Sequence, residues 1–508
     1  MTRTRTALSL IVIDALLAGG VASALAGPTT RPAVCAGYWY PKEPAELAGL
    51  VDKLFIDAPA GEVKGRPVAI IAPHAGYRFS APVAAAAYAR LRGQKYDRVI
   101  VIAFSHHRAY SYAGVSLPAD LNAYATPLGN IPIDMAAVEK LQKARPFVAL
   151  AGMDRDEHSL ELQLPFLQRA LGEFKLVPLL VGRMTLESYA QAAAGLRGIM
   201  DEQTLLVASS DCTHYGPNYD FVPFRDDVAK RLEELASKAA AAIQACDFDG
   251  LTAHLAATKD TICGQGPILL LLRTLSMGGG AEGLRTGFDM SGRQGNDYTN
   301  SVTYQSFVFT RPRGTLEEAA RAALLKLARE TVTAQLNHHE LPTPKEAELP
   351  AAVRADGACF VTLQNHGELR GCIGNMQAVG PLYESVRHNA VNACADSRFV
   401  SNPVTAGELG QIHIEISYLT PFKPVGKIEE IIIGRHGLLI GLGGNRGVLL
   451  PQVAYERGWT REVFLNEVCH KAGLPPGAWK DPQAKLYSFE AEVFGEPEPT
   501  TRPANGEK

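Results

Sequence analysis

Five short stretches in the first 270 residues of the chain place histidine, cysteine or carboxylate side chains beside apolar runs. The stretches are APHAGY, FSHH, DEHSLELQLPF, SSDCTHYG and TICGQGPI, and their candidate residues are His74; His106 and His107; Asp156, Glu157, His158 and Glu161; Asp211 and His214; and Cys263. Neutral imidazole and thiolate suit iron, copper and zinc, and two histidines with one anionic ligand are typical of non-haem iron sites. A further histidine near such a metal could move protons, because its unperturbed pKa is about 6.5.

The elements that must position these residues are predicted from apolar runs. Three candidate groups directly follow predicted buried strands at Val68–Ala72, Arg98–Ala103 and Thr204–Ser209. A fourth strand at Leu176–Val181 and helices at Pro82–Leu91 and Thr185–Met200 give an alternating pattern, which predicts an α/β sheet with flanking helices. Ligands of such sheets bind beyond the carboxyl ends of the strands, so we expect the three groups to converge there.

Each candidate also has an ordinary structural explanation. A histidine after a strand is often a simple loop residue, and Asp211 could cap a helix. His158 could bond to Glu161 one turn later, and Cys263 could be a small buried residue. The metal-site interpretation rests on the joint occurrence of the five stretches.

Together with AGYWYP, these stretches resemble the Memo family in order and approximate spacing, from about residue 32 to residue 311. The resemblance implies a fold similar to the class III extradiol dioxygenases. It also implies one iron or copper ion per chain, held by His74, His106 and Cys263. Since the dioxygenases have a carboxylate where this chain has a cysteine, oxygenase activity does not follow from the fold alone.

The resemblance also implies a set of residues around the metal. His158, Asp211 and His214 correspond to family pocket residues, with His214 as the acid/base group and Asp211 orienting it. We expect Tyr77 and Glu157 to line the substrate pocket, although simple packing explains Tyr77 equally well.

The pattern changes near residues 311–315, where Pro312 and Gly314 precede a predicted helix that ends at Leu336. From there to residue 494, the stretches LRGCIG, ADSRF, LLPQVAYERGW and CHKAGLP resemble the AMMECR family, which implies an α+β fold without a settled activity. The polar candidates of this unit are Arg370, Cys372, Asp396, Arg398, His413 and Glu415.

Two features of this second unit allow alternative interpretations. Cys372 could be a low-pKa nucleophile or a small buried residue, and Arg370 could bind a carboxylate or phosphate. The glycine run 441–444 lacks the Lys-Ser/Thr of a P-loop, so a turn between two strands is predicted.

Length and composition limit the classes of protein. A single core rarely exceeds about 300 residues, so 508 residues predict at least two domains. A formal net charge of −3 gives no support for nucleic-acid binding, and no window after the first thirty residues predicts an integral membrane domain. The eight cysteines form no CxxC pair, so free thiols are expected.

The two chain ends suggest processing and disorder. Residues 1–26 have Arg3 and Arg5, an apolar stretch containing Asp14, and an Ala-Leu-Ala site, which predicts a signal peptide and a periplasmic or secreted protein. Residues 495–508 are polar and proline-rich, which predicts a disordered tail. Memo-like and AMMECR-like proteins accompany a radical-SAM protein in the AmmeMemoRadiSam system, so the resemblance implies such a partner and a cytoplasmic location instead.

The leading functional hypothesis is a metal-dependent, oxygenase-like enzyme that acts on a small or modified substrate. The alternatives are a metal-binding or peptide-binding scaffold without turnover, and a hydrolase that uses Cys372. Iron and copper both accept histidine and cysteine, so the sequence does not choose between them.

Overall fold

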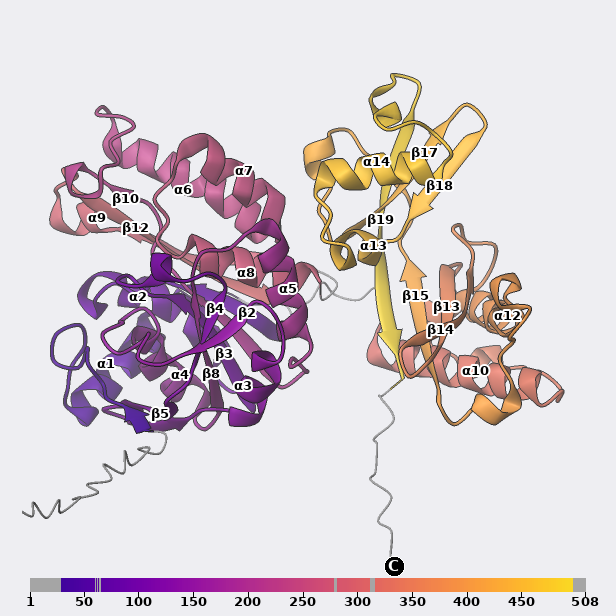
Figure 1. The fold of residues 1–508 in the computed structure, drawn as a ribbon, viewed down its shortest axis with the longest axis horizontal. Coiled ribbons are helices and arrows are strands. Elements are labelled where there is room, and N and C mark those ends of the chain that lie inside the picture. The colour runs from indigo at the N-terminus through magenta and orange to yellow at the C-terminus, as the bar shows by residue number, and fades with distance from the viewer. Residues whose placement is uncertain are drawn as a thin grey trace, which may run out of the picture.

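The computed structural model describes residues 29–59, 61, 63, 65–277, 281–310 and 316–496. The expected signal peptide, the boundary at 311–315 and the tail beyond residue 496 lie outside these residues. The described residues form two domains that lie side by side, with a mixed α/β first domain and an α+β second domain (Figure 1). This confirms the predicted fold class.

The first domain is organised around a nine-stranded sheet. Its strands, in spatial order, are β10 (His214–Tyr215), β12 (Ser301–Thr310), β2 (Pro67–Ala72), β9 (Thr204–Ser209), β3 (Arg98–Phe104), β8 (Lys175–Val181), β4 (Val115–Pro118) and β7 (Phe147–Leu150), with β11 (Glu282–Met290) paired to β12. The neighbours β2, β9, β3 and β8 are parallel. Their carboxyl ends therefore meet at one edge, as the sequence predicted.

Helices cover both faces of this sheet. One group comprises α1 (Pro44–Asp57), α2 (Tyr77–Tyr88) and α4 (Leu164–Leu171), and the other comprises α5 (Leu186–Arg197), α6 (Val228–Gln244), α7 (Phe248–Thr258) and α8 (Gln265–Ser276). Successive residues of a strand point to opposite faces of the sheet. In β12, Tyr304 packs with Val83 of α2 on one face, and Gln305 bonds to the Ala236 carbonyl of α6 on the other. The short helices α3 (Met135–Gln142) and α9 (Ser291–Gly295) lie at the periphery.

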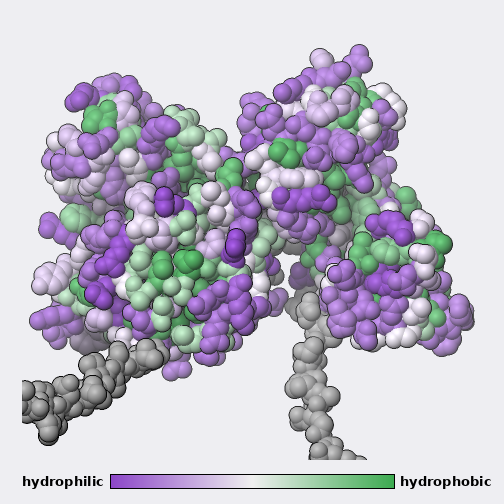
Figure 2. All heavy atoms as spheres, viewed as in Figure 1, coloured by the Kyte–Doolittle hydropathy of each residue, from purple (hydrophilic) through white to green (hydrophobic). Residues whose placement is uncertain are grey.

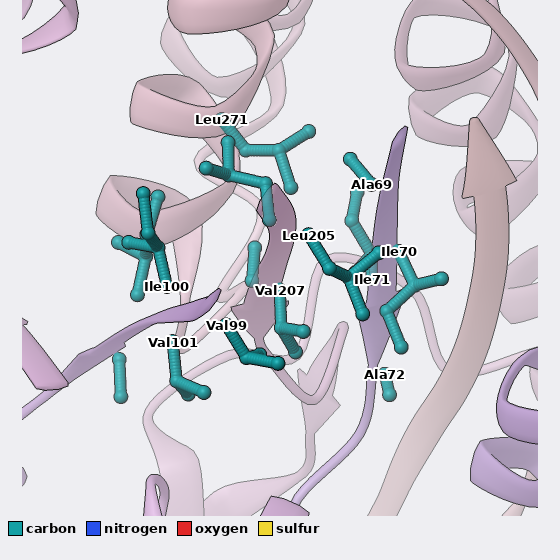
Figure 3. Packing of buried hydrophobic residues seen from close by; sticks show 14 of the residues in the cluster. Ala69, Ile70, Ile71, Ala72, Val99, Ile100, Val101, Leu205, Val207 and Leu271 are labelled. Carbon is teal, nitrogen blue, oxygen red and sulfur yellow. The ribbon is translucent and has the colours of Figure 1, made fainter. Parts of the chain in front are cut away.

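The core explains why the central strands consist of continuous apolar runs. Every residue of β9 is buried, and in β2 only Val68 is partly exposed. Figure 3 shows Leu271 of α8 beside residues of β2, β3 and β9, which are buried because helices cover both faces of this parallel sheet. The strands thus form a rigid base for the loops that follow them.

A small three-stranded sheet holds the beginning of the described chain. Its strands are β1 (Thr29–Arg31), β5 (Leu121–Thr126) and β6 (Gly129–Pro132). The parallel pairing of β1 with β5 carries Arg31 into the interior, where the residue is 2% exposed.

The second domain has a seven-stranded antiparallel sheet with helices on one side. Its strands are β13 (Ala358–Asn365), β14 (Glu368–Gly374), β15 (Ile412–Leu419), β16 (Lys423–Pro424), β17 (His436–Leu442), β18 (Asn445–Leu449) and β19 (Lys485–Gly495), and its helices are α10 (Glu318–Leu336), α11 (Ala351–Arg354), α12 (Leu382–Cys394), α13 (Pro451–Glu456) and α14 (Arg461–Lys471). Gly443 and Gly444 form the turn between β17 and β18, which confirms the predicted turn. β19 includes Gly495, and Glu496 pairs with Arg329, so the first two residues of the expected tail belong to this domain.

The two domains contact each other through polar groups. The Arg461 guanidinium pairs with Asp247 at 2.8 Å, and its backbone N–H donates to Asp249 at 3.0 Å. In the opposite direction, Arg273 of α8 donates to the Tyr455 carbonyl at 3.5 Å. Because α8 begins just after Cys263, its two ends lie at the candidate site and at the second domain.

The surface and the cysteines fit a protein whose apolar residues are mainly in its cores. Hydrophilic side chains predominate over both domains on the face in Figure 2, with hydrophobic ones in separate patches. All eight cysteines are free thiols, as predicted. In the described part of the chain, no helix combines the length and apolarity needed to cross a bilayer.

Candidate metal centre

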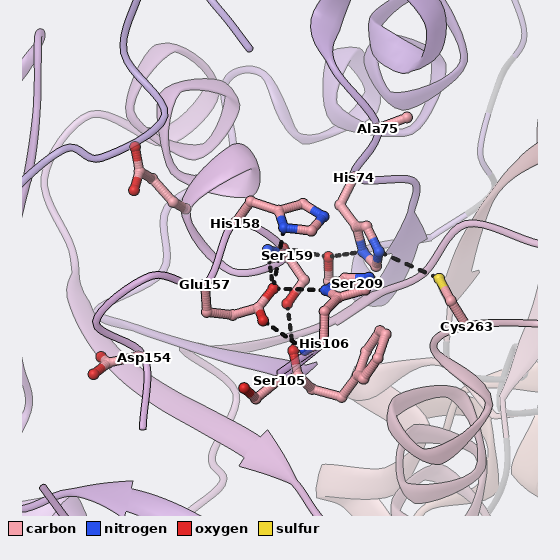
Figure 4. Close-up of polar contacts among 12 residues, drawn as sticks. His74, Ala75, Ser105, His106, Asp154, Glu157, His158, Ser159, Ser209 and Cys263 are labelled. Carbon is pink, nitrogen blue, oxygen red and sulfur yellow. Dashed lines mark hydrogen bonds and ion pairs between the residues drawn. The ribbon is translucent and has the colours of Figure 1, made fainter. Parts of the chain in front are cut away.

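Two parallel strands and the segment before one helix bring the predicted metal ligands together. His74 follows β2, His106 follows β3, and Cys263 precedes α8. One ligand atom from each of these residues lies within 4.8 Å of the other two. Figure 4 shows the two imidazoles beside each other and the thiol directed at His74.

The His74 imidazole is oriented by a serine on the neighbouring strand. His74 Nδ1 lies 2.9 Å from Ser209 Oγ, and that hydroxyl donates its own hydrogen to the Ser159 carbonyl at 2.5 Å. His74 Nδ1 must therefore be the donor, which leaves a lone pair on Nε2, 3.3 Å from Cys263 Sγ. Burial lowers the pKa of His74, so the ring is neutral and suited to bind a metal.

The His106 imidazole is oriented by a buried carboxylate. Glu157 accepts from His106 Nδ1 at 2.9 Å, from the His106 backbone N–H at 2.7 Å and from the Ser159 N–H at 2.8 Å. Burial alone would raise the pKa of Glu157, but its hydrogen bond to His106 and the charge of that ring lower it to about 2. A carboxylate behind a histidine fixes the ring so that the other nitrogen faces the metal.

The third candidate ligand, Cys263, lies on a segment packed tightly against β9. A Cβ atom at Gly264 would lie 2.4 Å from Ser210 Cβ, so only glycine permits this approach. Burial raises the pKa of the Cys263 thiol well above its ordinary value. A bound metal would favour the thiolate, because coordination deprotonates cysteine.

The donor set fits a borderline or soft transition metal. Two imidazole nitrogens and one sulfur suit iron, copper or zinc, whereas calcium and magnesium prefer oxygen ligands. The residues present therefore fit the redox metal that the sequence predicted, and they accept either iron or copper.

His214 and Asp211 form a second group of ligand-capable residues with Cys263. His214 Nδ1 is 2.9 Å from the Cys212 carbonyl and 3.2 Å from the Thr261 carbonyl. Because carbonyl oxygens only accept, Nδ1 carries the hydrogen and Nε2 is free to take a proton or bind a metal. Asp211 Oδ1 accepts from the backbone N–H groups of His74 and Ala75, so this carboxyl also holds the β2 loop, and burial raises its pKa.

His158 is stacked within an aromatic layer. Its ring centroid lies 4.2 Å from that of Trp39 on one side and 4.2 Å from that of His106 on the other. Burial and the neighbouring histidines lower the pKa of His158 to about 3, so this imidazole is neutral near pH 7.

The two residues expected to line a substrate pocket are both buried. The Tyr77 hydroxyl donates to the Leu162 carbonyl at 2.9 Å, and its ring packs against Phe166. Glu157, 2% exposed, lies behind His106 and supports that ring.

Several supporting residues have no signal in the sequence. Gln163 donates to Ser209 Oγ at 2.8 Å and to the Pro73 carbonyl at 3.0 Å, so it holds the loop before His74. Arg31 pairs with buried Glu161 at 2.5 Å and donates to the backbone carbonyls of Asp154 and Glu157. The segment that carries Glu157 and His158 is therefore fixed by the β1 strand.

The polar candidates of the second domain mainly cover the edge strand β14. Asp396 accepts from the Cys372 N–H at 2.9 Å, and Arg398 donates to the Cys372 carbonyl at 3.0 Å. Arg370 is bound to Glu408 and to two backbone carbonyls. The bonds of Asp396 and Arg398 satisfy backbone groups of Cys372 on an edge strand that could otherwise pair with another chain.

Three further candidates lie on the strands of this sheet. The Cys372 thiol accepts from Thr362 Oγ1 at 3.2 Å on the neighbouring strand. His413 Nε2 lies 2.6 Å from the Glu496 carbonyl, and burial raises the pKa of Glu415. None of these three is part of the metal-ligand groups found in the described residues.

Comparison with known proteins identifies both parts of the chain. The family model described as Memo-like protein matches residues 31–308, which is more than half of the sequence. The chain belongs to the Memo family. A second model, AMMECR1, matches residues 325–494, so a Memo domain is joined to an AMMECR1 domain.

Individual relatives match about a third of the chain. Protein TK0174 of Thermococcus kodakarensis is 41% identical over 187 residues, which cover 35% of this chain and 90% of that protein. Protein MK0488 of Methanopyrus kandleri is 40% identical over 198 residues, covering 36% and 91%. The crystal structure of the uncharacterized protein PH0010 from Pyrococcus horikoshii shares 34% identity, covers 37% of this chain and 96% of its own, and has a TM-score of 0.34.

Proposed function

We propose that the Memo domain is a redox-metal-dependent, oxygenase-like enzyme that acts on a small or modified substrate. The observation that carries the proposal is the convergence of His74, His106 and Cys263, with both imidazoles held by hydrogen bonds on their far nitrogens. A bound iron or copper ion would supply Lewis acidity and one-electron redox chemistry.

The residues around the centre have separate roles in this proposal. Glu157 and Ser209 fix the rings of His106 and His74, so the ligand geometry exists before metal binds. His214 Nδ1 bonds to the Cys212 carbonyl, so its Nε2 can take or return a proton of the substrate. Asp211 holds the backbone of the His74 loop, and its carboxyl group lies beside His214.

Two partly exposed aromatic rings suggest the shape of the substrate. Trp39, 38% exposed, stacks on His158, and Tyr219, 39% exposed, lies with its centroid 5.0 Å from that of His214. Flat apolar groups favour contacts with such rings, so a small aromatic substrate fits this arrangement.

The test is oxygen consumption by iron-loaded or copper-loaded protein with a panel of mono- and dihydroxy aromatic compounds. The proposal predicts uptake that requires a particular compound and falls at least about 100-fold in His214→Ala, as expected for loss of a general base. His107→Ala, a change at an exposed neighbour of His106, is the matched control. Stoichiometric metal without compound-dependent uptake would favour the alternative, a metal-binding or peptide-binding scaffold.

The family association also leads us to propose a radical-SAM partner for this chain within an AmmeMemoRadiSam system. Co-purification of a radical-SAM protein with the full-length chain tests this, and reproducible absence of such a protein would count against it. N-terminal sequencing of the purified protein tests the location of the chain. Cleavage of residues 1–26 would indicate an exported chain, which does not meet a cytoplasmic radical-SAM partner.

A further inference from the structure

The second domain aligns a thiol, a hydroxyl and a carboxyl group across three neighbouring strands. Cys372 of β14 pairs with Thr362 of β13, and Thr362 pairs with Glu415 of β15. Residues in paired positions of adjacent strands project from the same face of a sheet. The three side chains therefore form one polar row, whose outer two backbones lie about 10 Å apart because neighbouring strands are separated by about 5 Å.

This polar row lies on the face of the sheet opposite to helices α10 and α12. The neighbouring residues Val361 and Leu363 of β13 point the other way and pack in the core formed with those helices. Cys372 and Glu415 are both partly exposed. A ligand that lies across Thr362 can therefore reach the thiol at one end of the row and the carboxyl group at the other.

Two groups beside the Cys372 sulfur favour nucleophilic chemistry. Thr362 Oγ1 donates to Cys372 Sγ at 3.2 Å, and Arg398 Nη2 donates to the Cys372 carbonyl at 3.0 Å. The hydrogen bond with Asp396 raises the pKa of Arg398, and the Cys372 side chain adds to this shift, so the guanidinium also lies near the sulfur. A hydroxyl donor and a guanidinium both stabilise negative charge on sulfur, and the thiolate is the nucleophilic form of cysteine.

Two polar groups at the row are free to bind a ligand. Among the described residues, Arg398 Nη1 makes no hydrogen bond, and the Arg398 side chain is 54% exposed. The Glu415 carboxyl group also has no hydrogen-bond partner in this part of the chain. Burial raises the pKa of Glu415, the charge of His413 opposes this shift, and the charge of Glu456 adds to it. Such a carboxyl group can protonate a leaving group and later take a proton from water.

An apolar row lies beside the polar row on the same face. Phe360 comes two residues before Thr362 on β13 and pairs with Ser417, which in turn pairs with Val493, a residue that is 44% exposed. Gly374 also pairs with Phe360, and a Cβ atom there would lie 2.3 Å from Phe360 Cγ, so only glycine leaves room for this ring. The surface next to the thiol therefore suits a short apolar chain.

We propose that the second domain is a cysteine hydrolase that cleaves esters and thioesters of short apolar carboxylic acids. Cys372 is the nucleophile, Glu415 is the acid and base, and Arg398 Nη1 holds the carbonyl oxygen while that oxygen carries negative charge. None of these roles requires the metal centre of the first domain, so the inference does not rest on the function proposed for that domain.

The reaction proceeds in two balanced steps. In the first, the Cys372 sulfur bonds to the carbonyl carbon, the bond to the leaving alcohol or thiol breaks, and Glu415 gives that group a proton. In the second, water attacks the enzyme-bound thioester, gives a proton to Glu415 and releases the carboxylic acid, which restores the Cys372 thiolate.

Hydrolysis of 4-nitrophenyl acetate and 4-nitrophenyl butyrate by the full-length protein tests this proposal. Nitrophenolate release measures turnover, and mass spectrometry of proteolytic peptides identifies the acylated cysteine. The proposal predicts an acyl group on Cys372, and the loss of both this acylation and turnover in Cys372→Ala. Because nitrophenolate leaves without needing a proton, Glu415→Gln should still be acylated but should hydrolyse the acyl group about 100-fold more slowly. Glu368→Gln, a change at an exposed carboxylate of β14, is the matched control.

A further variant tests the stabilisation of the sulfur. Thr362→Val keeps the shape of the residue and removes the donor to Cys372, so acylation should be at least about 10-fold slower, as expected for loss of a hydrogen bond to a charged group. A normal circular dichroism spectrum confirms that each variant is folded.

The outcomes that would overturn the proposal are distinct from those that test the metal centre. Absence of acylation at Cys372 in the wild type, or turnover that persists in folded Cys372→Ala, would overturn it. Equal rates of acyl-group hydrolysis in the wild type and Glu415→Gln would also overturn it. A chelator that removes metal from the first domain should leave both steps unchanged, and loss of activity with the chelator would assign the reaction to the metal centre instead.

Discussion

Replacing Glu157 by glutamine tests how the metal centre is supported. The Glu157 side chain is 1% exposed and accepts three N–H groups, two of them from His106. The amide oxygen of glutamine can still accept from His106 Nδ1, but the amide NH₂ group must then face a backbone donor. The substitution therefore removes a charge and replaces at least one hydrogen bond with a donor–donor contact.

The expected loss is a 10–100-fold weaker affinity for metal, which is the usual effect of removing the carboxylate behind a histidine ligand. This corresponds to about 1.4–2.7 kcal/mol of binding free energy. Competition between the protein and a chelator for Co²⁺ measures the change. Asp156→Asn is the matched control, because the side chain of Asp156 is 68% exposed. A folded Glu157→Gln protein with wild-type affinity would refute this account of the support.

Three further predictions concern stability and the docking of the two domains. The pKa of Glu157 is depressed to about 2 in the folded protein, so its contribution to stability is present above about pH 4.5 and is lost as pH falls toward 2. Denaturant unfolding at several pH values should show this loss of stability. The loss between these pH values should be smaller in Glu157→Gln. Arg31→Met should destabilise the first domain by about 3–5 kcal/mol because it leaves Glu161 buried without its partner, and Arg31→Lys should recover part of this in the same assay. Arg461→Ala should loosen the contact with Asp247 and increase the radius of gyration in X-ray scattering; an unchanged radius would contradict a role for this pair in domain docking.

The convergence of His74, His106 and Asp211 could be predicted because it depends on local patterns, whereas Cys263 was indicated by the family resemblance. The apolar runs before His74, His106 and Asp211 are strands β2, β3 and β9, and these three strands are parallel neighbours. A parallel sheet brings the residues that follow its strands to the same edge. The full order of the strands did not have to be predicted, because any parallel sheet in which β2, β9 and β3 are neighbours brings these residues together.

The supporting contacts could not be predicted because they join distant parts of the chain. Arg31 and Glu161 are 130 positions apart, and His74 and Ser209 are 135 positions apart. Neither arginine nor serine has a local pattern that indicates such a partner. The contacts of Asp396 and Arg398 with β14 were likewise hidden, because they depend on how the end of α12 packs beside that strand.

The central claim is that His74, His106 and Cys263 hold a metal ion, and metal analysis of the purified protein tests it most directly. Full-length wild type, His74→Ala, Cys263→Ala and the control His107→Ala would be produced without added metal and analysed by mass spectrometry of their metal content. The account predicts stoichiometric iron or copper in the wild type and the control, and its loss in both ligand variants. Absence of metal from the wild type, even after anaerobic loading with iron or copper, would contradict it.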